Sequence, residues 1–203
     1  MKFRTPIVFA VCTLVALVQL GCSQATGSLI LSPVGGKKSF SQRFTQSYAS
    51  RNDDGSYDFV LIADDAEQSA RKAKPGKALK PTQDFPLRQL VHIRVPWLPM
   101  RGNIAETTVS NASLNWYIFS LAPDHVQDLL LYSGAGFALA REKGDKVTLK
   151  LKDATLRPQV ARGALNDPLG PFNLSGSIRT INDPGTVKDV LTRTRTQLGL
   201  GNP

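Results

Sequence analysis

The sequence feature that most constrains the fold is the strict alternation of apolar and polar side chains between residues 146 and 152. Aliphatic residues occupy every second position, with hydroxyl or basic residues between them: Val147, Leu149 and Leu151 against Thr148, Lys150 and Lys152. Successive side chains of a strand point to opposite faces, so this pattern predicts a strand with one face on a core. A second extended run precedes the polar turn at residues 142–145. Residues 128–158 are therefore predicted to form a β-hairpin at the centre of a β-rich domain.

The same two-residue period recurs along the chain. Alternating runs occupy residues 40–50, 56–63, 86–97, 112–121 and 172–181. The first two flank a loop ending in Asp54-Gly55, and Asp-Gly between alternating runs is a strong hairpin signal. The run at 112–121 has aromatic residues on both faces, which indicates a strand buried on two sides. Residues 133–136, Ser-Gly-Ala-Gly, interrupt the central hairpin and predict a bulge or a close approach of another backbone.

The period changes after residue 182. Asp183-Pro184 is typical of a helix start, with Asp as the N-cap and Pro at the first helical position. Apolar or small residues then follow at spacings of three and four: Val187, Val190, Leu191, Thr194 and Leu198. Strands followed by a helix predict a mainly β (α+β) fold. We expect an antiparallel β-sandwich or curled sheet of six to eight strands, with one C-terminal helix covering part of its apolar face.

The N-terminus has the pattern of an export signal. Two basic residues precede an apolar run at 7–18, which is too short to span a membrane. The Gly21-Cys22 pair that follows resembles the lipobox of bacterial lipoproteins. The resemblance implies a signal peptide at 1–21, acylation (palmitate) of Cys22, and a lipid anchor in a membrane of the bacterial cell envelope. Cleavage after Ala25, giving a soluble secreted or periplasmic protein, is the alternative.

Downstream of the signal, two regions are expected. Residues 22–39 mix small and turn residues, which predicts a flexible tether. Residues 40–200 are predicted to form a single β-rich globular domain. Both cysteines, Cys12 and Cys22, precede that domain, so no disulfide is expected within it.

The chain is basic, with 25 Lys and Arg against 16 Asp and Glu, a formal charge of +9. Loss of residues 1–21 removes Lys2 and Arg4 and leaves +7. Such a surface attracts polyanions, either an anionic polymer or lipid. The candidate binding residues lie in the polar segment 64–85: Arg71, Lys72, Lys74, Lys77 and Lys80. No aromatic residue is interleaved with them, which argues against a specific nucleic-acid partner; the alternative is an ordinary solvated loop.

The sequence carries little catalytic chemistry. The two histidines, His92 and His125, have no metal-site spacing, so neither a metal nor a cofactor is expected. A triad built from Ser133, His125 and Asp124 is strained, because adjacent side chains rarely face each other. An enzyme of this composition would need one of the histidines in a cleft beside a carboxylate.

Three functions follow as hypotheses. The first is a non-enzymatic cell-envelope lipoprotein that acts by binding or as a structural part. The second is a carrier of an apolar ligand or lipid, in a cavity between sheet and helix lined by aromatic residues: Trp97, Trp116, Tyr132 and Phe137. The third is a hydrolase-type enzyme. A carrier is expected to hold an apolar pocket larger than about 300 Å³.

Overall fold

The computed structural model describes residues 26–36, 38–64, 87–96, 110–121, 126–163 and 169–199. The predictions for the signal peptide, Cys22, the basic segment from Arg71 to Lys80, Trp97 and His125 concern residues outside these ranges.

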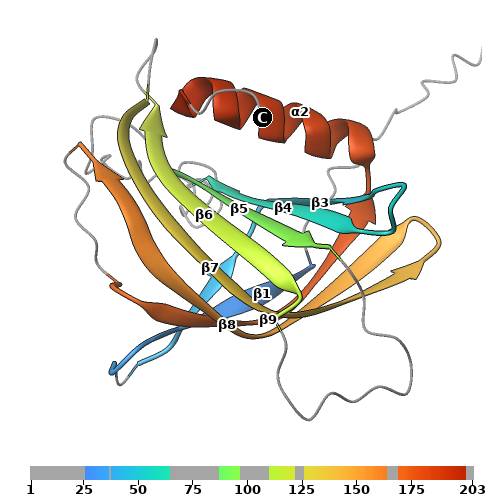
Figure 1. Cartoon of the computed structure of the whole chain (residues 1–203), viewed down its shortest axis with the longest axis horizontal. Helices are drawn as coiled ribbons and strands as arrows, with labels where there is room; N and C mark the ends of the chain where they lie inside the picture. The colour runs from blue at the N-terminus through green and yellow to red at the C-terminus, as the bar shows by residue number, and fades with distance from the viewer. Residues whose placement is uncertain are drawn as a thin grey trace, which may run out of the picture.

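Nine strands and one helix make up the described chain (Figure 1). The strands are β1 (Thr26–Pro33), β2 (Phe40–Arg43), β3 (Gln46–Arg51), β4 (Tyr57–Asp64), β5 (Leu87–Val95), β6 (Ala112–Leu121), β7 (Val126–Lys143), β8 (Lys146–Arg162) and β9 (Phe172–Asn182). The helix is α2 (Pro184–Leu198). The mainly β architecture with a C-terminal helix is thus confirmed. The strand number is higher than the predicted six to eight.

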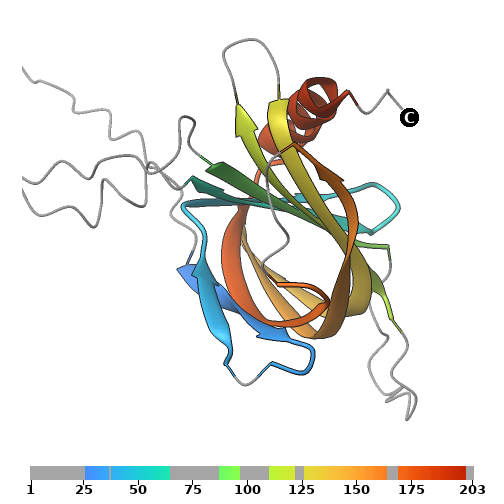
Figure 2. The same cartoon turned by 90° about the vertical axis from the view of Figure 1, so that its left-hand side faces the viewer.

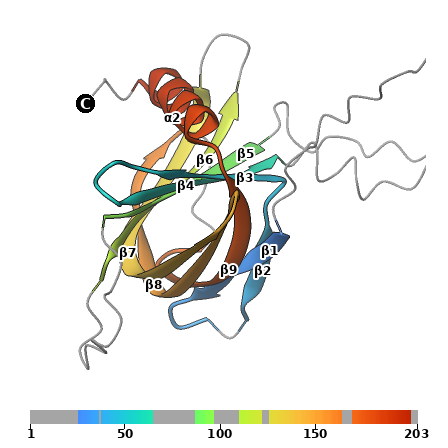
Figure 3. The same ribbon diagram turned by 90° about the vertical axis from the view of Figure 1, so that its right-hand side faces the viewer.

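All nine strands belong to one sheet, in the order β2-β1-β9-β3-β4-β5-β6-β7-β8, and β8 also pairs with β9. The sheet therefore closes on itself through seven strands, β3 to β9, as the views in Figure 2 and Figure 3 show. The described pairs are antiparallel except β3–β9, which is parallel and spans two residue pairs. A single closed sheet replaces the two layers of a sandwich, because the long strands β7 and β8 bend round to meet β9.

The interior of the closed sheet is the main core. The predicted inward residues Val147, Leu149 and Leu151 are at most 2% exposed, so the alternation is confirmed. Aromatic rings meet across the interior: the ring centroids of Trp116 and Phe172 lie 5.8 Å apart, and those of Tyr132 and Phe172 lie 5.1 Å apart. Both pairs have edge-on geometry, which aromatic rings prefer.

The predicted tether at 22–39 is wrong over residues 26–33. These residues form β1, which pairs with β9 along its whole length and with β2 on its other side. Leu29 and Leu31 point into the core and are at most 5% exposed. Two buried leucines and a full ladder of backbone hydrogen bonds outweigh the flexibility of the surrounding Gly and Ser residues.

The glycines of β7 allow the close backbone approach that the sequence predicted. A Cβ atom on Gly134 would lie 1.9 Å from the carbonyl oxygen of Thr155, and one on Gly136 would lie 2.4 Å from the Cβ of Ala154. The register of the β7–β8 pair shifts beside them, between Ala135 and Phe137. Side chains at these positions are excluded by the neighbouring strand.

Helix α2 begins where its sequence predicts, at Asp183-Pro184. The side chain of Asp183 accepts hydrogen bonds from the backbone N–H and the hydroxyl of Thr186, and Gly199 ends the helix in the left-handed conformation. The helix packs on the outer face of the closed sheet, where a second core cluster forms: Val60, Leu90, Phe119, Leu129, Val187 and Leu198. The two-sided burial predicted for residues 112–121 is therefore confirmed: Trp116 faces inward and Phe119 lies under the helix. No helix within the described ranges has the length and apolar character needed to cross a bilayer.

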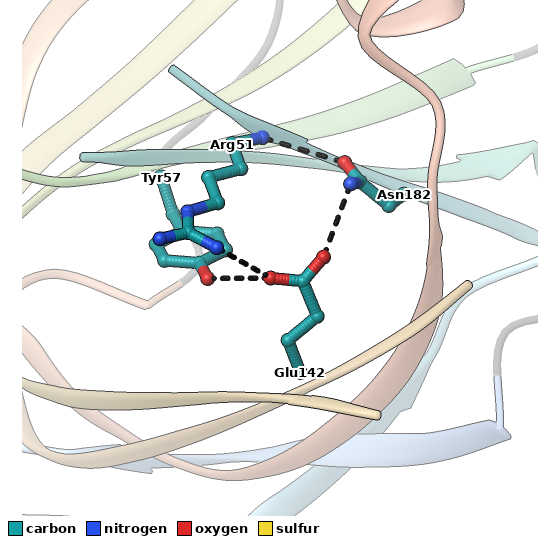
Figure 4. A network of polar contacts seen from close by, with 4 residues as sticks. All are labelled: Arg51, Tyr57, Glu142 and Asn182. Atoms are coloured by element: carbon teal, nitrogen blue, oxygen red, sulfur yellow. Dashed lines mark hydrogen bonds and ion pairs between the residues drawn. The ribbon is translucent and has the colours of Figure 1, made fainter. Parts of the chain in front are cut away.

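A polar network bridges the short seam between β3 and β9 (Figure 4). The Glu142 carboxylate accepts hydrogen bonds from Tyr57 Oη at 3.1 Å and Asn182 Nδ2 at 3.4 Å. It also forms an ion pair with Arg51 at 3.2 Å, and the backbone N–H of Arg51 donates to Asn182. Four strands are thus tied together where the backbone ladder is shortest.

Candidate functional site

Two clefts flank helix α2 where it lies on the sheet. The first, called here the α2 cleft, has a volume of about 210 Å³. The sheet contributes Leu90, His92, Arg94, Ser113, Asn115 and Tyr117, and the helix contributes Leu191, Thr194, Arg195 and Leu198. The second cleft, of about 280 Å³, lies on the other side of Thr194 and Leu90 and includes Asp64, Arg88 and Arg193.

The strand residues of the α2 cleft occupy outward positions of β5 and β6. Val91, Ile93, Leu114 and Trp116 alternate with them and fill the interior. The sheet register places His92 directly opposite Asn115, and Arg94 opposite Ser113. Strand alternation therefore selects the polar set, and the docked helix adds Arg195 from a distant part of the sequence.

His92 is held in place by the carboxylate of Asp58 on the neighbouring strand β4. Its Nε2 lies 2.8 Å from Oδ1 of Asp58, and Asn52 donates to the other carboxylate oxygen at 2.8 Å. Burial raises the pKa of Asp58, but the hydrogen bonds from His92 and Asn52 outweigh burial, and the pKa stays below its ordinary value. Because an ionised carboxylate only accepts, Nε2 of His92 carries the proton in this pair.

Asn115 and Tyr117 continue the polar lining along β6. Oδ1 of Asn115 accepts a hydrogen bond from the Ser133 hydroxyl at 2.7 Å, which leaves the Asn115 amide nitrogen as its donor group. Burial raises the pKa of Tyr117, and the positive charge of Arg195 opposes that rise. Tyr117 thus stays neutral, able to donate its proton, and close to a guanidinium group.

The charge of the α2 cleft is one-sided. Among the described residues its lining includes Arg94, Arg195 and His92 but no carboxylate. Asp58, an acid outside the lining, lies on β4 opposite Arg94 and contacts His92. The second cleft differs, because Arg88 there forms an ion pair with Asp64 at 3.2 Å. Of the two, only the α2 cleft has cationic groups and no carboxylate among its described lining residues.

The structure brings together two of the predicted apolar-pocket residues, Trp116 and Tyr132, which lie opposite each other on β6 and β7. Trp116 and Tyr132 are packed in the interior, at most 2% exposed. Phe137 is half-buried and precedes the inward-facing Ala138, so strand alternation places it on the outer face. Helix α2 also lies outside the closed sheet, so Trp116 and Tyr132 do not face it. Trp116, Tyr132 and Phe137 therefore do not line a common cavity between sheet and helix, and Trp97 lies outside the described residues.

The acidic residues of the β3–β4 hairpin make local contacts. Asp54 accepts from the backbone N–H of Ser56 and Asp58 binds His92, so both acids serve the hairpin and its neighbours. Within the described part of the chain, no three His, Cys, Asp or Glu side chains are grouped as metal ligands. His92 does lie in a cleft beside a carboxylate, the arrangement set as the requirement for an enzyme. Ser133, the nearest hydroxyl considered as a nucleophile, donates to Asn115 instead.

The sequence singled out His92 as one of the two histidines that an enzyme would need, but it missed the arginines that share the cleft. Arg94 follows His92 by two residues, so strand alternation already puts both on one face. No local signal links Arg195 to them, because that contact depends on where the helix docks.

Comparison of the chain with protein-family models, with curated proteins and with solved structures gives no match.

Proposed function

We propose that this protein is an exported cell-envelope lipoprotein, anchored to a membrane through Cys22, and that it acts as a non-enzymatic binding module. The α2 cleft is its ligand site, and the ligand presents a small anionic group, a carboxylate or a phosphate. One observation supports the binding role: among the described residues that line the α2 cleft are Arg94, Arg195 and His92 but no carboxylate.

The chemistry of recognition follows from the side chains. A guanidinium group presents a planar fork of N–H donors that matches two oxygens of a carboxylate or phosphate. Tyr117 and Asn115 add neutral donors from the floor of the cleft. Leucines 191 and 198 of the helix form an apolar wall, and a partly water-excluded site strengthens charge interactions.

The size of the cleft limits the ligand. At about 210 Å³ it is smaller than the roughly 300–1,000 Å³ of pockets that enclose drug-sized molecules. The cleft therefore admits a small anion, or the charged end of a longer molecule whose remainder stays in solvent.

Thermal unfolding with inorganic phosphate or succinate tests the binding role. We expect a saturable rise in melting temperature at millimolar concentration in the wild type, because a ligand that binds only the folded state stabilises it. Arg94→Gln combined with Arg195→Gln is expected to abolish the rise. A matched control, Arg141→Gln with Arg179→Gln on the opposite side of the molecule, is expected to retain it. Equal responses of the two double variants would refute the assignment.

The anchor has its own test. Cells expressing the wild type are expected to incorporate labelled palmitate into the protein and retain it in the membrane fraction. Cys22→Ala is expected to lose the label. An unlabelled wild-type protein in the soluble fraction would refute the anchor and leave the cleft assignment standing.

A second candidate function, transport of an apolar ligand inside the closed sheet, has one observation in its favour. The indole Nε1 of Trp116 is buried in the interior and has no hydrogen-bond partner among the residues that the structure describes. A buried unpaired donor is costly, by about 1–3 kcal/mol, and a ligand acceptor would remove that cost. Native mass spectrometry of the purified protein tests this candidate, since a carrier retains its ligand and shows a second mass.

A further inference from the structure

A strongly basic surface lies on the side of the molecule opposite α2. Figure 1 shows the helix above the closed sheet and strands β8, β9 and β1 below it. Over β8, β9, β1 and β2 the described residues include seven Lys and Arg, and one acid, Asp153. The exposed, outward-pointing basic residues of these strands, with Arg141 of the neighbouring strand β7, are called here the basic face. They are Arg43, Arg141, Lys150, Lys152, Arg157 and Arg179.

The strand register shows that these charges form neighbouring rows on one surface. Arg141 pairs with Thr148, which pairs with Arg179, which pairs with Thr26. In the next row, Lys150 is followed across the sheet by Ser177, Ser28 and Arg43. Residues directly opposite each other on adjacent strands share a face. The inward residues Leu149 and Ile178, both 0% exposed, confirm that their neighbours point outward.

Apolar side chains lie among the charges. Leu139 is opposite Lys150, and Phe137 is opposite Lys152, both half-buried on the outer face. Ile30 of β1 is 44% exposed on the same side. Basic residues interspersed with apolar ones are the composition of protein surfaces that contact lipid headgroups.

The position of the anchor selects a membrane as the partner. Thr26, the first residue of β1, pairs with Arg179 within the basic face. Cys22 precedes Thr26 by four residues, and four residues of extended chain reach at most about 14 Å. A lipid on Cys22 would therefore hold this edge of the basic face close to the headgroups.

We infer that the basic face docks on anionic headgroups of the membrane that receives the N-terminal anchor, and so turns the α2 cleft away from that membrane. The inference rests on the proposed anchor at Cys22. Docking gives the anchored protein one orientation, with its ligand site facing the aqueous side.

Lysine acetylation on vesicles tests the inference. The full chain is reconstituted in phosphatidylcholine vesicles or in vesicles with equal parts phosphatidylcholine and phosphatidylglycerol, and the acetylation rate of each lysine is read by peptide mass spectrometry. On the anionic vesicles we expect Lys150 and Lys152 to react at least about fivefold more slowly, the factor that corresponds to one basic residue held at an anionic surface. Lys188 on α2 is expected to react equally on both.

Matched variants separate charge on this face from charge in general. Arg141→Gln with Arg179→Gln is expected to restore rapid acetylation of Lys150 and Lys152. Lys188→Gln with Arg193→Gln removes the same charge from the helix side and is expected to leave their protection intact. Equal effects of the two variants, or equal acetylation rates on both kinds of vesicle, would overturn the inference.

Two further measurements distinguish the anchor from the face. Flotation with neutral vesicles reports the anchor alone, so a protein that floats but shows no lysine protection retains its anchor and contradicts the docking face. Protection confined to anionic vesicles without flotation on neutral ones supports the face and contradicts the anchor. Protection by soluble heparin but not by anionic vesicles would make the partner a polymer and overturn the inference.

Discussion

Gly134→Ala is the sharpest test of how the central hairpin is built. The added Cβ would lie 1.9 Å from the carbonyl oxygen of Thr155 and 2.9 Å from the Cα of Leu156. Both neighbours are backbone atoms of β8, so no side chain can rotate away. Because real Cβ atoms do not come closer than 3.0 Å to such atoms, the two strands must separate by roughly 1 Å.

The cost can be worked from that separation. A ladder hydrogen bond lengthened by about 1 Å is lost, at about 1 kcal/mol for each of one or two bonds. Overpacking adds about 1–3 kcal/mol. The free energy of unfolding is therefore expected to fall by about 2–5 kcal/mol, and the melting temperature by roughly 4–20 °C for a domain of this size.

Urea denaturation followed by circular dichroism measures the effect, with Gly185→Ala as the control. Gly185 lies in the first turn of α2, where an added Cβ meets only Asp183 Oδ1 at an ordinary 3.6 Å. The control is expected to be neutral or stabilising by up to about 1 kcal/mol, since Ala is the better helix former. If Gly134→Ala stays within about 0.5 kcal/mol of the wild type, the close approach of β7 and β8 is refuted.

Three further predictions concern polar groups. Asp183→Ala removes the N-cap of α2 and is expected to lower the free energy of unfolding by about 1 kcal/mol, whereas Asp183→Asn is expected to retain most of the cap's stabilisation. The midpoints of urea denaturation measure both effects. The pKa of Asp58 is depressed below its ordinary 3.8, so its pairing with His92 stabilises the fold above that pH, and this stabilisation is lost as the pH falls through the lower folded-state pKa. Asp58→Asn should therefore make the free energy of unfolding fall less steeply at acid pH. An unchanged dependence on acid pH would contradict this. Burial and the hydrogen bond to Glu142 raise the pKa of Tyr57, so Glu142→Gln should move the phenolate absorbance transition to lower pH.

The elements of the fold were predictable because their signals are local. Two-residue periodicity located β4, β5, β6, β8 and β9 to within a few residues, and the Asp183 cap located the start of α2. Closure of the sheet was not predictable, because it depends on β8 meeting β9 and on a parallel contact of only two residue pairs with β3. Strand β1 was missed because only Leu29 and Leu31 mark it within a Gly- and Ser-rich segment.

The candidate site was predictable only in part. His92 and Arg94 share a strand face, and alternation alone places both outward. Arg195 joins them because α2 docks on the outer face of the sheet, closest to β3 and β4, and that docking depends on apolar residues on the outer faces of several strands. The surroundings of the predicted aromatic residues were not predictable either, since periodicity gives the two faces of a strand but not which of them becomes the interior.

An amide-resolved NMR titration of the full chain with inorganic phosphate tests the anion-binding assignment most directly. We expect saturable shifts at residues 92, 94, 115 and 195, which lie around the α2 cleft. Shifts confined to residues 141, 150 and 179 of the basic face, or shifts that grow linearly without saturation, would contradict it.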